Sequence, residues 1–261
     1  MTIDMVGRID ECFLLSYAVD PERAATLVPA GLDLITHRGC AFLNIVVCRI
    51  ERMRPRLVPN ALGLTYWHVA YRLHVSATIS RGISIEGLYF LRSDVDRPLF
   101  GAIGNRLTDF KFHRSRVTFR SAGQGWALTV IDPCGVGSAI MRARPTINPP
   151  RCGLFPSIEE RERVLKYAPF GLSVSRSGQH VRVAEVQRDE RMWKEMPVAV
   201  EAAQWRFPES LGLHTGELAR ATRVSPIDYR WRIGRTGLLC YRSGLPQKEG
   251  RCLQPSPRRP I

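Results

Sequence analysis

The feature that most constrains the fold is a long series of short strand-like runs, separated by Gly, Pro and polar clusters. The runs cover residues 12–18, 40–50, 64–76, 84–94, 116–120, 126–131, 170–176 and 180–187. Parallel neighbours would need crossover connections of a dozen or more residues, usually helices, and the helical segments are too few and too short to supply them. The sequence therefore predicts an α+β protein with a mainly antiparallel sheet or barrel.

Two short helices are expected between these runs. Asp20 can cap a helix that has Pro21 at its first position, and this helix must end near Pro29. Ser157 and Glu160 have capping-box spacing, so a second helix begins there, with Glu160 reaching back to the Ser157 backbone.

The same pattern of β-rich runs continues from residue 12 to about 242 without a linker, which predicts one domain over residues 1–242. Residues 243–261 hold four prolines, a pair of arginines and few apolar residues. This composition predicts a disordered, basic, Pro-rich tail.

The net charge of +14 raises the alternative of a nucleic-acid-binding module. The basic residues are spread along the whole chain, however, and a scattered excess is a weaker signal than a stripe, so nucleic acid is not the expected partner.

No uncharged run approaches the roughly 18 residues of a membrane span, and no secretory signal is recognisable. The seven cysteines include no C-x-x-C pair, which disfavours disulfides and a cysteine zinc site and favours the cytoplasm.

Neither a metal nor a cofactor is expected. His68 and His74 share a strand face but would lie ~20 Å apart, too far to bind one metal ion. The loop at residues 133–138 lacks the glycine and lysine pattern of a nucleotide-binding loop and is interpreted as a turn.

The run at residues 65–74 has an unusual polar face. Tyr66, His68 and Arg72 alternate with aromatic and aliphatic residues, so they share one side of a strand. In a closed barrel this face could line a ligand cavity. The alternative is that the polar face meets water.

Lys111 is one of only four lysines and lies between Phe110 and Phe112. Desolvation and nearby arginines would lower its pKa and free an amine for Schiff-base chemistry. The alternative is a solvent-facing lysine on an edge strand, because strict alternation places Lys111 opposite the two phenylalanines.

Six segments, taken in order, carry a resemblance to a known family. They are FLLSYAVDPE at 13–22, LVPAGL at 27–32, AFL at 41–43, GLYFLRSD at 87–94, RLTDFKFHRS at 106–115 and PIDYRW at 226–231. Their order and spacing resemble the acetoacetate-decarboxylase-like superfamily, and most of all its uncharacterised branch, a domain of unknown function. The resemblance implies a cone-shaped, closed, mainly antiparallel β-barrel with a few short helices and an internal pocket.

The family's imine-forming lysine aligns with Phe112 and its neighbouring lysine with His113, and the pocket glutamate expected after Tyr66 is missing. Phenylalanine cannot form an imine, so the resemblance implies the fold without the family's decarboxylation mechanism.

These inferences predict a pocket protein for a small, anionic organic ligand; whether it catalyses a reaction stays open. Arg72 or Arg92 would pair with a carboxylate, and Tyr89 would donate a hydrogen bond. Tyr89 and Arg92 have opposite parity, so both can face inward only across a bulge. The ligand-binding candidates are Tyr66, His68, Arg72, Tyr89, Arg92 and Phe112. The catalytic candidates are Lys111 and His113; His113, like His68, could act as acid or base.

Three alternatives remain open: a Schiff-base enzyme that uses Lys111, a nucleic-acid-binding module, and a homo-oligomeric scaffold whose pocket is vestigial.

Overall fold

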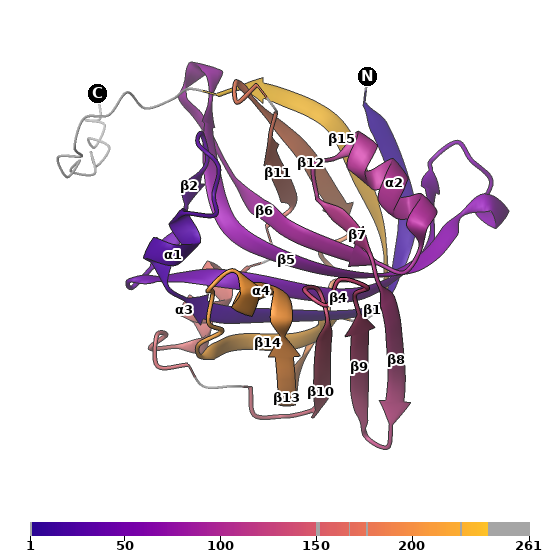
Figure 1. Ribbon diagram of the computed structural model, residues 1–261, viewed down its shortest axis with the longest axis vertical. Coiled ribbons are helices and arrows are strands. Elements are labelled where there is room, and N and C mark those ends of the chain that lie inside the picture. The colour runs from indigo at the N-terminus through magenta and orange to yellow at the C-terminus, as the bar shows by residue number, and fades with distance from the viewer. Residues whose placement is uncertain (1, 150–151, 167, 176, 225, 240–261) are drawn as a thin grey trace, which may run out of the picture.

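The computed structural model describes residues 2–149, 152–166, 168–175, 177–224 and 226–239 (Figure 1). The predicted tail at 243–261 lies outside the described residues, and the single domain over 1–242 stays a prediction. The strands are β1 (Ile3–Val19), β2 (Asp33–Leu34), β3 (Thr36–His37), β4 (Cys40–Pro55), β5 (Leu64–Ile79), β6 (Ile83–Val95), β7 (Phe112–Arg114), β8 (Arg116–Ala122), β9 (Gly125–Ile131), β10 (Ala139–Pro145), β11 (Phe170–Val174), β12 (His180–Arg188), β13 (Glu195–Trp205), β14 (Leu218–Val224) and β15 (Ile227–Leu238). The helices are α1 (Pro21–Ala25), α2 (Pro98–Leu107), α3 (Ile158–Val164) and α4 (Arg206–Ser210), with single 3₁₀ turns η1 (Asn60–Leu62) and η2 (Ser80–Gly82).

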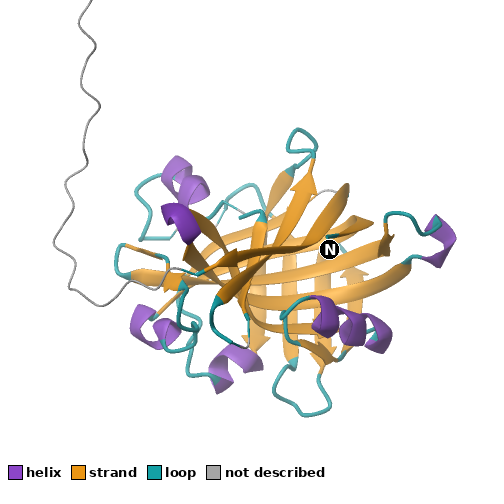
Figure 2. Cartoon of the chain, turned by 90° about the horizontal axis from the view of Figure 1, so that it is seen from above, coloured by secondary structure: helices purple, strands orange, loops and turns teal. Residues whose placement is uncertain are grey.

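Seven strands close into a ring through the order β1–β4–β5–β6–β11–β12–β15 and back to β1. All of these pairings are antiparallel except β6–β11, which is parallel. The strands curve around a common interior, with the helices at the periphery (Figure 2). The predicted class, a mainly antiparallel closed barrel with a few short helices, is confirmed.

A second group of strands branches from the ring at β1. The first half of β1 pairs with β15, whereas its second half pairs with β14. From β14 the order continues through β13, β10, β9 and β8, which lie below the ring in Figure 1. Because β1 also pairs with β4 over nearly its whole length, it belongs to both groups.

The ring strands that pack against the second group are buried on both faces, as β5 shows. On one face of β5, Val69, Tyr71 and Leu73 belong to a hydrophobic cluster that also includes Leu128 and Trp205 from the second group. On the other face, Tyr66 and Ala70 belong to a separate cluster inside the ring. These strands therefore lack the alternation of apolar and polar residues that marks a half-exposed strand.

A bulge in β6 decides which of its side chains share a face. Tyr71 pairs with Arg92 and Arg72 pairs with Phe90, so Leu91 is the extra residue. Tyr89 and Arg92 consequently lie on one face despite their opposite parity. This is the bulge that the sequence interpretation required, but the shared face is the one opposite to His68 and Arg72.

The two expected helices are present. The Asp20 carboxylate accepts from the Glu22 amide at the start of α1, and the Ser157 hydroxyl accepts from the Glu160 amide at the start of α3. The Glu160 side chain contacts His37 at 3.2 Å, so the capping box is half formed. Helix α2 was not predicted. Within the described residues, no helix is long and apolar enough to cross a membrane.

Candidate functional site

A cavity lies inside the ring, and all seven ring strands contribute to its lining. It holds about 50 Å³ of space for the centres of water-sized molecules, which corresponds to on the order of four waters. A molecule of a few heavy atoms would fill it.

Aromatic rings form much of the cavity wall. Phe90 and Phe110 stack with their centroids 3.9 Å apart, and Trp231 meets Phe110 edge-on at 6.0 Å. Gly171 lines the wall beside them, where a Cβ would lie 2.7 Å from the Phe110 ring. A larger residue at position 171 would therefore displace the stacked pair.

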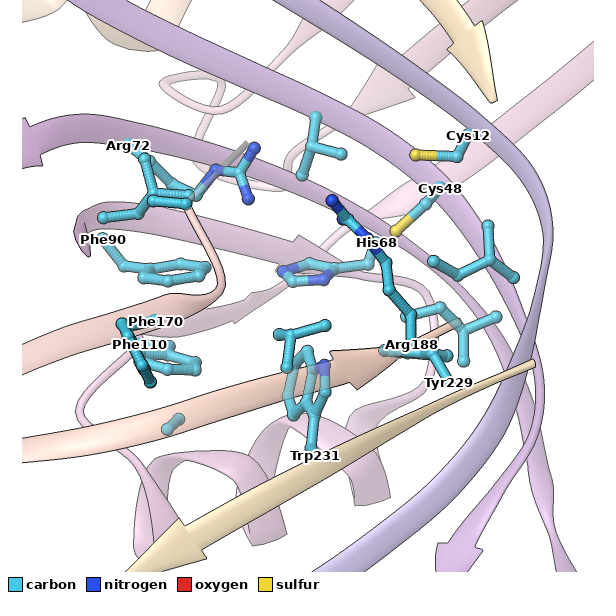
Figure 3. A pocket seen from close by; sticks show the side chains of 18 of the residues that line it. Cys12, Cys48, His68, Arg72, Phe90, Phe110, Phe170, Arg188, Tyr229 and Trp231 are labelled. Carbon is cyan, nitrogen blue, oxygen red and sulfur yellow. The ribbon is translucent and has the colours of Figure 1, made fainter. Parts of the chain in front are cut away.

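Three basic side chains enter this apolar cavity. Figure 3 shows His68 and Arg72 from β5 and Arg188 from the end of β12 pointing toward one another. Arg72 is 3 % exposed, and its guanidinium lies 5.7 Å from the centroid of Phe90. Arg188 lies 3.5 Å over the Trp193 ring, and its Nε donates to Glu190 at 3.0 Å. No carboxylate is among the described residues that line the cavity.

His68 is a neutral imidazole inside the cavity. Burial, and then the nearby Arg72 charge, lower the pKa of His68 to about 3. Its buried Nε2 has no hydrogen-bond partner in the described part of the chain. A ligand that hydrogen-bonds to this nitrogen would satisfy a polar atom that is otherwise costly to bury.

Two thiols complete the polar lining. Cys12 pairs with Cys48 across β1 and β4, and Cys48 pairs with His68 across β4 and β5, so the three side chains lie in one row. Burial raises the pKa of Cys48 to about 12 and raises that of Cys12 well above its usual range. Both are therefore protonated thiols near neutral pH. In the described residues, no group of three or more His, Cys, Asp or Glu side chains could hold a metal ion.

Two other predicted ligand-binding residues lie next to the cavity without lining it. Tyr66 stacks on Phe100 of α2 at 3.9 Å, and burial raises the pKa of its hydroxyl. Phe112 lies 5.5 Å from the His68 ring and fills the space over Gly104 of α2. Both residues pack against α2, and Phe112 also packs against the His68 ring.

The remaining predicted residues lie on the opposite face of the wall. The Nζ of Lys111 donates to the Tyr89 hydroxyl at 2.7 Å and lies 4.5 Å from the centre of that ring. Lys111 is exposed and has a φ of +55°, a left-handed backbone conformation. His113 is also exposed, and partial burial followed by the charge of Arg92 lowers its pKa. The structure therefore does not bring Lys111, Tyr89, Arg92 or His113 together with His68 and Arg72.

Arg92 belongs to a buried ion-pair network instead. Its guanidinium contacts Asp94 at 2.8 Å and Asp132 at 2.9 Å. The Ser115 hydroxyl donates to Asp94, and the Gly137 amide donates to Asp132. The network connects β6 to the turn between β9 and β10, which gives Arg92 a structural role.

Several residues that line the cavity were not among the predicted site residues. Phe90, Phe110, Arg188 and Trp231 come from four separate segments, and only the enclosed ring shows that they meet. The PIDYRW segment carried part of the signal, because it contains Trp231 and Tyr229, both of which line the cavity.

Solved structures with the same architecture include acetoacetate decarboxylases and an enzyme of enduracididine biosynthesis. Acetoacetate decarboxylase from Legionella pneumophila matches with a TM-score of 0.60 and 14% identity, over 92% of this chain and 88% of that one. An acetoacetate-decarboxylase-like enzyme from Sphingomonas wittichii RW1 matches with a TM-score of 0.55 and 13% identity, over 91% and 92%. MppR, an enduracididine biosynthesis enzyme solved in complex with pyruvate, matches with a TM-score of 0.55 and 11% identity, over 92% and 91%.

The chain thus shares the fold of the acetoacetate-decarboxylase-like superfamily. The chain belongs to the DUF2071 family of uncharacterized conserved proteins, whose model matches residues 8–217. No curated protein matches the sequence. The predicted kinship, an uncharacterised branch of this superfamily, is confirmed.

Proposed function

We propose that the ring cavity binds a small organic carboxylate between Arg72 and Arg188, with His68 as a neutral hydrogen-bonding partner. The observation that carries this proposal is the composition of the lining: two guanidiniums and an unpartnered imidazole nitrogen in an aromatic cavity, with no carboxylate among its described residues. A bound carboxylate would accept charge-assisted hydrogen bonds from guanidinium groups, which are about twice as strong as neutral ones.

The cavity size and the neighbours of this fold support a short ligand. Its volume suits a molecule of a few heavy atoms, and MppR, which shares the fold, was solved with pyruvate. Pyruvate is therefore a suitable first probe, with acetate and acetoacetate as shorter and longer companions.

The test compares carboxylate binding by the native protein and by Arg72→Met, measured by isothermal titration calorimetry. Methionine keeps the unbranched stem but removes the charge, so we expect pyruvate affinity to fall by at least about tenfold. Arg142→Met is the matched control, because Arg142 lies on the exposed side of β10 and should leave binding unchanged. Equal pyruvate affinity in Arg72→Met and the native protein, with unchanged melting temperatures, would overturn the proposal.

Lysine-imine chemistry inside this cavity has less support. No lysine lines the cavity in the described part of the chain, and the Nζ of Lys111 is on the other face, against Tyr89. The Schiff-base alternative thus requires a site at the surface.

A further inference from the structure

A second, open groove lies beside the cavity and is rich in arginine. It has a volume of about 740 Å³. Its basic residues are Arg8, Arg52, Arg54, Arg56, Arg188 and Arg230. A volume this large, against about 50 Å³ inside the ring, can accept a much larger group than the cavity can.

The end of β4 and the residue after it supply three of these arginines. Arg52 and Arg54 lie in β4 and Arg56 follows Pro55, and all three line the groove. Met53, between the first two, points the other way and is 2 % exposed in the hydrophobic cluster inside the ring. A register shift between Ile50 and Met53 and a φ of +53° at Arg52 turn this end of the strand toward the groove.

The groove keeps a positive charge after its ion pairs are considered. Its three carboxylates each contact an arginine: Glu51 contacts Arg49 at 3.3 Å, Asp189 contacts Arg191 at 3.1 Å, and Asp228 contacts Arg8 at 3.4 Å. Two more groove arginines contact carboxylates outside it: Arg188 contacts Glu190 at 3.0 Å, and Arg230 lies 4.0 Å from Asp4. The excess positive charge therefore lies on Arg52, Arg54 and Arg56.

Arg52 and Arg56 are exposed, and no carboxylate of the described residues lies within 4.0 Å of either guanidinium. Arginine in this state is suited to phosphate, which accepts two parallel hydrogen bonds from a guanidinium.

The groove and the cavity meet at two shared residues. Arg188 and Tyr229 line both. Arg188 points into the cavity beside His68 and Arg72 (Figure 3). One ligand that passes this junction would therefore reach the cavity with one end and the arginine groove with the other.

We propose that the groove binds a phosphate group of the ligand whose carboxylate end occupies the cavity. The inference rests on the proposed carboxylate site and names the ligand class, a phosphorylated carboxylic acid. The carboxylate contacts Arg72, and the phosphate contacts the side chains of Arg52 and Arg56.

The experiment uses ω-phosphonoalkanoates with three to eight carbons and, for each, the alkanoate of the same length. Affinities are measured by calorimetry on the full chain at low salt. At one or more chain lengths the phosphonate should bind at least about tenfold more tightly than its alkanoate. Arg52→Gln/Arg56→Gln should remove this gain and leave alkanoate affinity unchanged. The matched control Arg116→Gln/Arg120→Gln, on exposed positions of β8, should keep the gain.

The outcomes separate the two proposals. If alkanoates bind in an Arg72-dependent way but the phosphonate gain is absent at every length, or survives Arg52→Gln/Arg56→Gln, the groove proposal is overturned and the carboxylate site stands. If no alkanoate binds, both fall. If the double variant instead loses affinity for a single-stranded oligonucleotide and there is no phosphonate gain, the groove binds nucleic acid and the proposal is overturned.

Discussion

Phe110 and Lys111 are neighbours in sequence but lie on opposite faces of the barrel wall. The Phe110 ring stacks on Phe90 in the cavity, whereas the Lys111 Nζ donates to Tyr89 on the other side. This reversal within two residues separates the lysine near the family's catalytic position from the cavity inside the ring.

The separation predicts that Lys111 forms no imine with a small keto acid. Incubation with acetoacetate or pyruvate followed by borohydride should leave the mass of the Lys111 peptide unchanged, because a solvent-facing lysine holds no substrate beside it. Peptide mass spectrometry checks this result, with Lys111→Arg as the blank. A reduced adduct at Lys111 that is absent from the variant would restore the Schiff-base alternative.

Two buried histidines should make the protein sensitive to mild acid. Burial and the Arg72 charge lower the pKa of His68 to about 3 and that of His74 to about 4, below the value of about 6.5 in an unfolded chain. The folded state therefore binds fewer protons, so this stability is present above pH ~6.5 and is lost as the pH falls toward these values.

Between pH 7.5 and 5.0 each histidine should remove about 2 kcal/mol from the free energy of unfolding. Urea denaturation at the two pH values measures the loss, and His74→Gln should reduce it by one histidine's share. An equal pH dependence in the variant and the native protein would show that His74 is not responsible.

The buried pair between Arg92 and Asp132 should contribute strongly to stability. Asp132→Ala removes a carboxylate that contacts Arg92 at 2.9 Å and accepts from the Gly137 amide at 2.7 Å. Arg92 keeps its pair with Asp94, so the loss is that of buried donors left unsatisfied, about 1–3 kcal/mol, which urea unfolding would reveal. Glu201→Ala breaks the exposed pair with Arg144 and should cost less than about 1 kcal/mol; similar losses in both variants would contradict the structural role of Arg92.

The cavity thiols should be unreactive in the folded protein. Burial keeps Cys12 and Cys48 protonated, and only the thiolate is nucleophilic. Iodoacetamide at pH 8 should modify the exposed Cys134 while sparing these two, as peptide mapping would show. Modification of Cys48 at the rate of Cys134, without prior unfolding, would contradict a buried and protonated Cys48 thiol.

The eight predicted runs fall on β1, β4, β5, β6, β8, β9, β11 and β12, because each carries its own local pattern, whereas β10, β13, β14 and β15 were not predicted. The face of β5 with His68 and Arg72 was also found, because strict alternation along one strand identifies which residues point the same way. Strand alternation could not decide whether Arg72 or Arg92 is the arginine that faces the cavity. The answer depends on the bulge in β6 and on which face of the wall encloses the cavity, and both are set by pairing between distant strands.

The presence of Arg188 in the cavity could not be predicted from sequence for a related reason. Arg188 lies at the end of a predicted strand, and no motif distinguishes it from the many other arginines. Its importance depends on the contacts with Trp193 and with the cavity, which arise only when the ring closes.

The position of β1 has a consequence for synthesis on the ribosome. Ile3 pairs with Ile233, and Cys12 pairs with Val224, so β1 is synthesised long before β14 and β15, with which it pairs. Co-translational folding can assemble the β4–β5–β6 meander early, but the ring cannot close until β15 has emerged. Until then one edge of β1 is unprotected and exposes a nascent apolar strand, a natural point for a chaperone to engage.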